Sequence, residues 1–280
     1  MNPATGPRAL VVMGSLLIGG LLAIGGMGWI GRGGALNPSG KSFKTSQDSR
    51  LEGGRLPPAR PAWVSPLQPS CTIQDLAQRQ HLQSLLLALR TAPQRVRVDP
   101  TNFGERFRRD AFGRAVDPTP RLVVLHETVY GMNSAIQTFR TPHPNDGDQV
   151  SYHALIGEDG RVIQLLDPSK RAFGAGNSAF NGQWVVTNPK VGGSVNNFAL
   201  HVSLETPLDG ENDNAGHSGY SSAQYDALAA LLADWMGRYP ITLETITTHR
   251  AVDLGGERAD PRSFNWQALQ ERLQNLGLLC

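Results

Sequence analysis

The stretch RLVVLHETVYG, residues 121–131, is the part of the sequence that decides the expected fold. Its four branched apolar residues, Leu122 to Leu125, predict a buried β-strand. The strand ends on His126, so this histidine is expected at the edge of a sheet, where ligands can gather. A lone histidine is more often a hydrogen-bonded core residue than a ligand, and the stretch alone favours a structural role for it.

The composition of the 280-residue chain narrows the classes of partner. Its formal net charge of +2 is too small to indicate binding to nucleic acid. As a separate expectation, the chain is a monomer. The two cysteines, Cys71 and Cys280, form no CxxC pair, which excludes a zinc cluster held by thiolates. They bracket the expected folded region, and the sequence is compatible with a disulfide between them or with two free thiols.

An uncharged apolar segment runs from Ala9 to Ile30. Its 22 residues are long enough to cross a bilayer, so residues 1–36 are predicted to be a retained membrane anchor or, alternatively, an export signal. Residues 37–70 are rich in Pro, Gly and Ser and lack apolar periodicity, which is typical of a flexible tether. These segments predict a domain in the cell envelope, anchored to the outer face of the cytoplasmic membrane, or secreted if the apolar segment is cleaved.

The rest of the chain is predicted to form an α/β domain preceded by one helix. In residues 71–94, leucines recur at helical spacing from Leu82 to Leu89, so this helix is expected to pack on the domain. Within residues 95–280, apolar strands are interspersed with helical patterns, which predicts a mixed central β-sheet flanked by helices. The strands are expected at residues 122–125, 150–156, 161–166, 199–205 and 245–249, and the clearest helices at 221–239 and 265–276.

The run ALHVSLE, residues 199–205, alternates strictly between apolar and polar residues. A period of two predicts a strand with one apolar face and one polar face. The polar face carries His201, Ser203 and Glu205, and is a candidate location for chemical groups.

A second histidine, His249, also ends a short β-branched run, and Asp260 follows it in the sequence RADP. Two imidazoles and one carboxylate leave the fourth position of a tetrahedral zinc ion open, which is the pattern of catalytic zinc. These ligand types suit zinc better than copper(I) or calcium. The spacing alone is weak evidence, because the chain has seven histidines.

Five motifs, in order, resemble those of the zinc-dependent N-acetylmuramoyl-L-alanine amidases of type 2, whose superfamily includes phage-lysozyme amidases and peptidoglycan recognition proteins. The motifs are LVVLHETVYG, VSYHALIGEDGRVIQLLD, RAFGAGNS, NNFALHVSLETP and THRAVD followed by RADPRSFNW. The resemblance extends over about residues 121–266 and leaves out the anchor, the tether and the first helix. It implies an α/β domain with a zinc site at one edge of the sheet.

The resemblance also implies roles for individual residues. It implies that His126, His249 and Asp260 are the zinc ligands, and that Tyr152 matches a tyrosine that some members use beside the metal. Arg258 stands where many members have lysine. Many members have a glutamate in a GIE motif on the third strand. Here the motif reads HVS, so the glutamate position is Ser203, and Glu205 on the same face is the alternative acid/base candidate.

Four further positions are less clearly assigned. Phe173 and Gly174 replace the Trp and His of a WHAG loop common in the family, so the contribution of that histidine is absent. His201 shares a strand face with Glu205 and is open between support of a ligand and a structural role. His217 is expected at the surface.

The resemblance implies zinc-dependent hydrolysis of the amide bond between N-acetylmuramic acid and L-alanine in peptidoglycan, for remodelling of the cell wall. Within this resemblance, Tyr152, Glu205 and Arg258 are the predicted catalytic residues. Two alternatives remain open on the sequence, namely a peptidoglycan-recognition module that does not cut and a zinc peptidase that acts on stem peptides.

Overall fold

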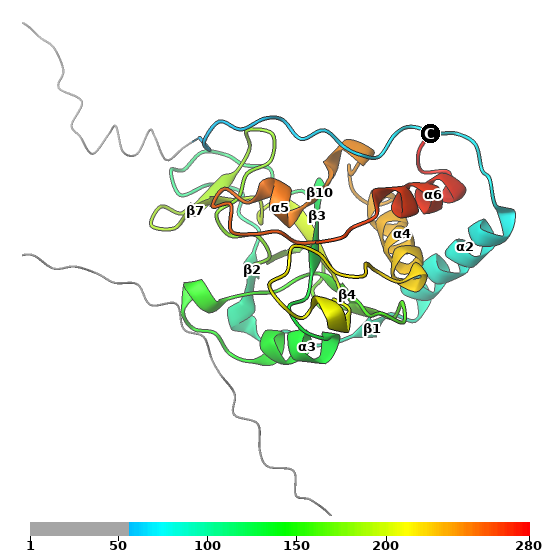
Figure 1. The fold of residues 1–280 in the computed structure, drawn as a ribbon. Coiled ribbons are helices and arrows are strands. Elements are labelled where there is room, and N and C mark those ends of the chain that lie inside the picture. Colours follow the sequence, from blue (N-terminus) through cyan, green and yellow to red (C-terminus); the bar gives the residue numbers. More distant parts are fainter. Residues whose placement is uncertain (1–55) are drawn as a thin grey trace, which may run out of the picture. The chain divides into compact units, whose positions relative to one another are not determined.

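The computed structural model describes residues 56–280 and places a mixed six-stranded sheet at its centre (Figure 1). The strand order is β1-β5-β4-β9-β3-β10, where the strands are β1 Gln94–Arg95, β3 Leu122–Glu127, β4 Ala154–Ile156, β5 Val162–Gln164, β9 Ala199–Leu204 and β10 Ile246–Thr248. Strands β4, β9, β3 and β10 are parallel to one another. On its other side, β4 pairs antiparallel with β5. The predicted mixed sheet is therefore confirmed, and the strands expected at residues 150–156 and 161–166 pair with each other as β4 and β5.

Two small antiparallel sheets and several short helices complete the strand-rich side. The small sheets pair β2 Phe103–Glu105 with β6 Lys170–Ala172, and β7 Val185–Asn188 with β8 Gly192–Ser194. The remaining short elements are α3 Met132–Arg140, α5 His249–Val252 and the 3-10 turns η1 Pro100–Asn102, η2 Asp146–Asp148, η3 Leu208–Gly210 and η4 Leu243–Thr245. Strand β6 is not among the strands expected from the sequence.

Three longer helices lie together on one side of the central strands in Figure 1, namely α2 Leu76–Thr91, α4 Ser222–Met236 and α6 Trp266–Leu276. Helix α4 begins directly after Ser221, which forms a reciprocal capping box with Gln224. Its leucines are fully buried against Val123 and Leu125 of β3, and Leu82 of α2 joins the same core. The helix predicted before the domain therefore contributes directly to the main hydrophobic core.

Strand β3 is buried on both faces, and this burial decides where its histidine lies. Val123 and Leu125 face the helical layer, whereas Leu122 and Val124 face a second core formed with Phe198 and Val252. Apolar residues on both faces are the usual composition of a central parallel strand. The strand is therefore fixed in register, and its last residues lie at an edge of the sheet beside the ends of β9 and β10.

Strand β9 has the predicted alternation of apolar and polar residues, but both of its faces are covered. All six of its residues are buried, and His201 and Ser203 have no exposed area. The reason is that β9 lies between β4 and β3, so both of its faces are covered. Polar side chains on a doubly covered strand must find partners inside the protein, which makes this face part of the site described below.

The membrane segment predicted at Ala9–Ile30 lies outside the described residues. Among residues 56–280, no helix combines the length and apolar character required to span a bilayer. The described end of the predicted tether differs from the expectation, since Leu67 is buried and Ser65 donates a hydrogen bond to the carbonyl of Leu243 at 2.8 Å. A segment without periodicity can still pack when single apolar residues find pockets, and here Leu67 does so.

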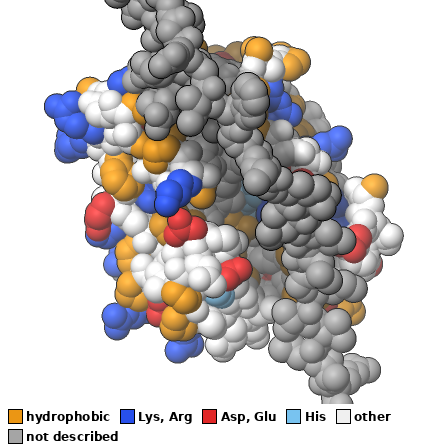
Figure 2. Space-filling model, turned by 90° about the vertical axis from the view of Figure 1, so that its left-hand side faces the viewer, with side chains coloured by type: hydrophobic (Ala, Val, Ile, Leu, Met, Phe, Trp, Pro, Cys, Tyr) orange, Lys and Arg blue, Asp and Glu red, His pale blue; other side chains and the backbone are white. Residues whose placement is uncertain are grey.

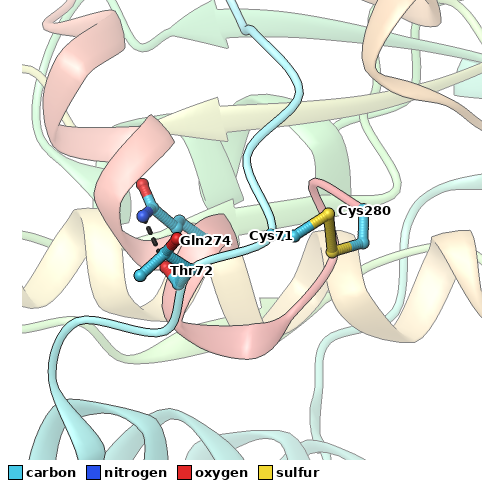
Figure 3. The surroundings of a disulfide bond; sticks show 4 residues. All are labelled: Cys71, Thr72, Gln274 and Cys280. Atoms are coloured by element: carbon cyan, nitrogen blue, oxygen red, sulfur yellow. Dashed lines mark hydrogen bonds between the residues drawn. A yellow bond between two sulfur atoms is a disulfide. The ribbon is translucent and has the colours of Figure 1, made fainter.

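A disulfide joins Cys71 to Cys280, with their Cα atoms 4.8 Å apart and 209 positions apart in the sequence (Figure 3). Beside it, Gln274 of α6 donates a hydrogen bond to the carbonyl of Thr72. Of the two possibilities that the sequence left open, the structure has the disulfide. It ties the segment that leads into α2 to the C-terminal end of the domain.

The described residues visible in Figure 2 carry charges of both signs. On the described part of the face shown in Figure 2, basic and acidic side chains are interspersed with hydrophobic and uncharged ones. An extended surface of one sign, which would favour a nucleic-acid partner, is not seen on the visible described residues of this face.

Candidate metal centre

Three predicted ligands, His126, His249 and Asp260, meet at the edge of the central sheet. Strands β3 and β10 are parallel neighbours with Leu125 opposite Thr248, so the next residues, His126 and His249, also lie side by side. Asp260 reaches both imidazoles from the loop after α5. Its carboxylate oxygens lie 3.1 Å from Nδ1 of His126 and 3.0 Å from Nδ1 of His249.

The protonation states of this cluster suit a metal ion. Burial lowers the pKa of His126 to about 4, so its imidazole is neutral at pH 7. Burial alone would raise the pKa of Asp260, but hydrogen bonds from the two histidines outweigh it and lower that pKa. The ligand atoms all lie within 4.8 Å of one another. Two imidazoles and one carboxylate are a donor set that fits zinc with one position left open.

Tyr152 lies beside this cluster, as predicted. Its ring stacks on the imidazole of His126, with the centroids 4.5 Å apart and the planes at 24°. Phe139 of α3 packs edge-on against the other side, 5.4 Å away between centroids. Burial raises the pKa of Tyr152, so the phenol keeps its proton at neutral pH and can donate a hydrogen bond.

The cluster opens into a hollow of about 990 Å³. His249, Asp260, Tyr152 and Arg258 all line it. Arg258 is exposed in the loop that leads to Asp260, and its backbone amide donates to Asp253 at 3.1 Å. The structure therefore brings five of the six predicted site residues together, namely His126, His249, Asp260, Tyr152 and Arg258.

Glu205 is the predicted site residue that the structure does not bring to the cluster. One of its carboxylate oxygens accepts from the amide of Met132 at 2.6 Å, and the other accepts from the amide of Glu158 at 3.0 Å. The first contact places a negative charge at the N-terminus of α3, where it is favourable. Glu205 lies one residue beyond the end of β9, and the loops on either side of that end take up its carboxylate.

Glu127 is a residue whose role the sequence left unassigned. Its buried carboxylate accepts hydrogen bonds from Nε2 of His217 at 3.1 Å, the backbone amide of Arg262 at 2.9 Å, the Arg262 guanidinium and the Tyr220 hydroxyl. The expectation of a surface position for His217 is wrong, because its side chain has no exposed area. An acidic residue directly after the predicted ligand His126 was the available signal, since a carboxylate next to a buried strand end requires partners.

Arg262 connects the carboxylate of Glu127 to the loop of residues 210–214. Its guanidinium donates to Glu127 and to the carbonyls of Asn212 and Asn214, both at 2.8 Å, and of Gly210 at 2.6 Å. Arg262 follows the ligand Asp260 by two residues. The Glu127–Arg262 pair therefore holds the loop that carries Asp260 against the end of β3.

His153 is the second buried imidazole next to the site. Its Nδ1 accepts the backbone N–H of His201 at 3.0 Å, and its Nε2 lies 3.2 Å from the carbonyl of Lys170. Burial, followed by the nearby guanidinium of Arg106, lowers the pKa of His153 to about 3. His153 is therefore a buried residue of the core beside the site.

We expect His153 to make the fold sensitive to acid. Because its folded pKa lies below the usual 6.5 of the unfolded chain, its contribution is fully present above about pH 6.5 and is lost as the pH falls toward 3. The slope of unfolding free energy between pH 6 and pH 4 should be shallower in His153→Asn than in the wild type by about 1.4 kcal/mol per pH unit. Urea unfolding at several pH values measures it, and equal slopes would contradict this expectation.

The sequence model of a known family matches residues 116–263, and the description of that family is N-acetylmuramoyl-L-alanine amidase, type 2. The match covers more than half of the chain. The chain belongs to this family. All six predicted site residues lie within the matched range of this amidase family, and so do both sides of the Glu127–Arg262 pair.

Curated relatives are amidases of the same kind. The chain is 31% identical over 126 residues to a protein of Enterobacter cloacae named 1,6-anhydro-N-acetylmuramyl-L-alanine amidase AmpD, covering 44% of this chain and 57% of that protein. It is 33% identical over 120 residues to the Citrobacter freundii protein of the same name, covering 42% of this chain and 54% of that protein. The chain thus spans somewhat more than half the length of these relatives.

Solved structures of amidases are also similar. A crystal structure of a selenomethionine AmpD derivative matches with a TM-score of 0.49 and 26% identity, covering 65% of this chain and 94% of that one. The structure of AmpDh3 from Pseudomonas aeruginosa in complex with an anhydromuramic pentapeptide matches with a TM-score of 0.42 and 21% identity, covering 57% of this chain and 63% of that one.

Proposed function

We propose that the chain is a zinc-dependent amidase that hydrolyses the bond between the lactyl group of N-acetylmuramic acid and L-alanine in peptidoglycan. The observation that carries this proposal is the meeting of His126, His249 and Asp260 at the base of a hollow, inside the range matched by the amidase family. Non-cutting recognition is less well supported, because all three ligand positions hold residues that bind zinc well.

The three ligands would hold the ion through Nδ1 of each imidazole and the carboxylate of Asp260. When bound, zinc acts as a Lewis acid and makes water a nucleophile at neutral pH. The chain prepares for it by keeping His126 neutral and Asp260 ionised. The side chain of His126 is enclosed by protein, whereas His249 and Asp260 face the hollow from which a substrate enters.

Two further side chains are positioned to act on the substrate. Hydrolysis of an amide develops negative charge on the carbonyl oxygen, and a fixed donor near that oxygen stabilises the transition state. Tyr152 is such a donor, since its ring is held between His126 and Phe139 and its phenol remains protonated. Arg258 adds a positive charge from the rim of the same hollow. Glu205 has no part in this account.

The walls of the hollow suit a ligand with both sugar and peptide parts. Phe107, Val129 and Val191 are exposed hydrophobic residues that line it, and they alternate with polar side chains such as Asn177 and Asn196. Aromatic and aliphatic surface supports sugar rings and alanine side chains, while amide side chains bond to N-acetyl and peptide groups.

We also propose that the chain acts outside the cytoplasmic membrane, on polymeric cell wall. Two features support this location. The apolar segment Ala9–Ile30 is long enough to anchor or export the chain, and the Cys71–Cys280 disulfide suits an oxidising compartment. We likewise propose that the apolar segment contacts the membrane and that the chain is a monomer.

The proposed reaction can be tested with purified chain and purified muropeptides. The chain is incubated with them in the presence of zinc or of a chelator, and the products are identified by mass spectrometry. Release of the intact stem peptide and of free muramic-acid sugar, lost with the chelator, is the expected result. Binding without cleavage would instead indicate a recognition module, and cleavage between two amino acids would indicate a peptidase.

A further inference from the structure

We propose that His201 is a positioning residue for the metal ligand His126, and that Gly174 is present to make room for its ring. The inference rests on the metal site proposed above but not on the identity of the substrate. Nothing in the family description assigns a role to position 201, and the sequence pattern alone left it open.

The two imidazoles make a direct contact. Nε2 of His126 lies 3.0 Å from Nδ1 of His201, and neither side chain has any exposed area. The other ring nitrogen of His126, Nδ1, faces Asp260. Strand pairing produces this arrangement. His201 of β9 lies opposite Val124 of β3, and His126 is two residues further along β3, so the side chains of His201 and His126 are on the same buried face.

The direction of this hydrogen bond follows from the metal site. A ligand nitrogen must be free of a proton, so Nδ1 of a metal-binding His126 carries none and Nε2 carries the N–H. Nε2 of His126 is then the donor and Nδ1 of His201 is the acceptor. Among residues 56–280, no other group makes a hydrogen bond to Nε2 of His126. With a metal ion on Nδ1, His201 therefore holds His126 in the tautomer protonated at Nε2 and fixes the rotation of its ring.

His201 is itself held firmly. Its backbone N–H donates to Nδ1 of His153 at 3.0 Å, and the two rings stack with an angle of 8° between their planes. Nε2 of His201 has no hydrogen-bond partner among the described residues. The ring thus uses only Nδ1 for side-chain bonding, and the atom that it bonds belongs to a metal ligand. An unpaired ring nitrogen in the protein interior costs free energy, and packing alone does not explain why a histidine occupies this position.

Gly174 leaves the space that the ring of His201 occupies. A Cβ atom on residue 174 would lie 2.4 Å from Nδ1 and 2.6 Å from Cγ of His201, closer than real atoms approach. Position 174 and the His201 ring therefore compete for one volume next to His126. A chain with an imidazole at 201 requires glycine at 174, and this chain has both.

The test compares two replacements of His201 in the full chain. In His201→Asn, the side-chain oxygen can take the place of Nδ1 as an acceptor, whereas His201→Leu fills similar space without one. Zinc affinity is measured on metal-free protein by competition with a chromogenic chelator. We expect His201→Leu to bind zinc about 10- to 100-fold more weakly than the wild type, and His201→Asn to recover most of that loss. Leu82→Ala, a fully buried change in the helical core, is the control for general destabilisation and should keep wild-type zinc affinity.

A second measurement, made on the wild type, tests the proposal even if the His201→Leu variant does not fold. In the zinc-loaded wild type, ¹⁵N NMR of the histidine side chains should show His126 protonated at Nε2, with a proton slow to exchange. His126 protonated at Nδ1 would overturn the proposal, as would wild-type zinc affinity in His201→Leu or equal losses in the Leu and Asn variants. Because both readouts are independent of cleavage, an intact His201 effect without amidase activity would refute only the proposed reaction.

Discussion

Replacing His249 with alanine is expected to abolish stoichiometric zinc binding and to lower the rate of amide cleavage by about 10³-fold or more. A bound zinc ion contributes several kcal/mol of transition-state stabilisation, and each 1.4 kcal/mol is a factor of ten in rate. His249 is the better choice for this test than His126, because its side chain faces the hollow. Alanine there leaves an enlarged hollow rather than a cavity in the core.

The matched control is His81→Ala on α2, whose imidazole is 55% exposed and lies 3.5 Å from Asp226. Metal content by mass spectrometry and release of stem peptide are measured for the wild type and both variants. His81→Ala should retain both properties. Cleavage at the wild-type rate by His249→Ala would show that the chain does not use this histidine as a ligand.

Replacing Arg262 with methionine is expected to destabilise the fold by about 3–5 kcal/mol, because it leaves the buried carboxylate of Glu127 without its charged partner. Both side chains are largely buried, at 11% exposure for Arg262 and 6% for Glu127, so solvent compensates little. The change also removes the bonds to the carbonyls of residues 210, 212 and 214. We therefore expect a lower zinc affinity as well, since the loop that carries Asp260 is no longer held.

Arg258→Met serves as the comparison for stability. Arg258 lies four residues earlier in the same loop but is exposed, so its replacement should change the free energy of unfolding by less than about 0.5 kcal/mol. Denaturant unfolding with linear extrapolation measures both variants. Equal stabilities of Arg262→Met and Arg258→Met would contradict the structural role of the Glu127–Arg262 pair.

Most of the sheet, and the meeting of His126, His249 and Asp260, could be predicted from short apolar runs and from the family resemblance. The run Leu122–Leu125, bounded by Pro120 and Gly131, favours a buried strand, and its end then places His126 at a sheet edge. The parallel register of β3 and β10 brings His249 beside it, which no local pattern states but which the family resemblance implies. The helix predicted at residues 221–239 corresponds to α4, Ser222–Met236, because its pattern is local in the sequence.

The partners of polar side chains could not be predicted in the same way. Periodicity shows which face of β9 carries His201, Ser203 and Glu205, but not what covers that face. Glu205 was expected near the metal, and the structure instead binds it to amides that are 73 and 47 positions away in the sequence. The contacts of His201 with His126, and of Glu127 with Arg262, likewise join residues 75 and 135 positions apart. Such pairs depend on the three-dimensional packing of whole segments.

The central claim is that the chain hydrolyses the amide between the lactyl group of muramic acid and L-alanine. Reaction in ¹⁸O-labelled water tests it directly, because the oxygen of the attacking water remains in the new carboxylate. Mass spectrometry of the products should find one ¹⁸O atom in the lactyl carboxylate of muramic acid and none in the released stem peptide. Label in a carboxylate of the peptide, or recovery of unlabelled and uncleaved muropeptide, would contradict the claim.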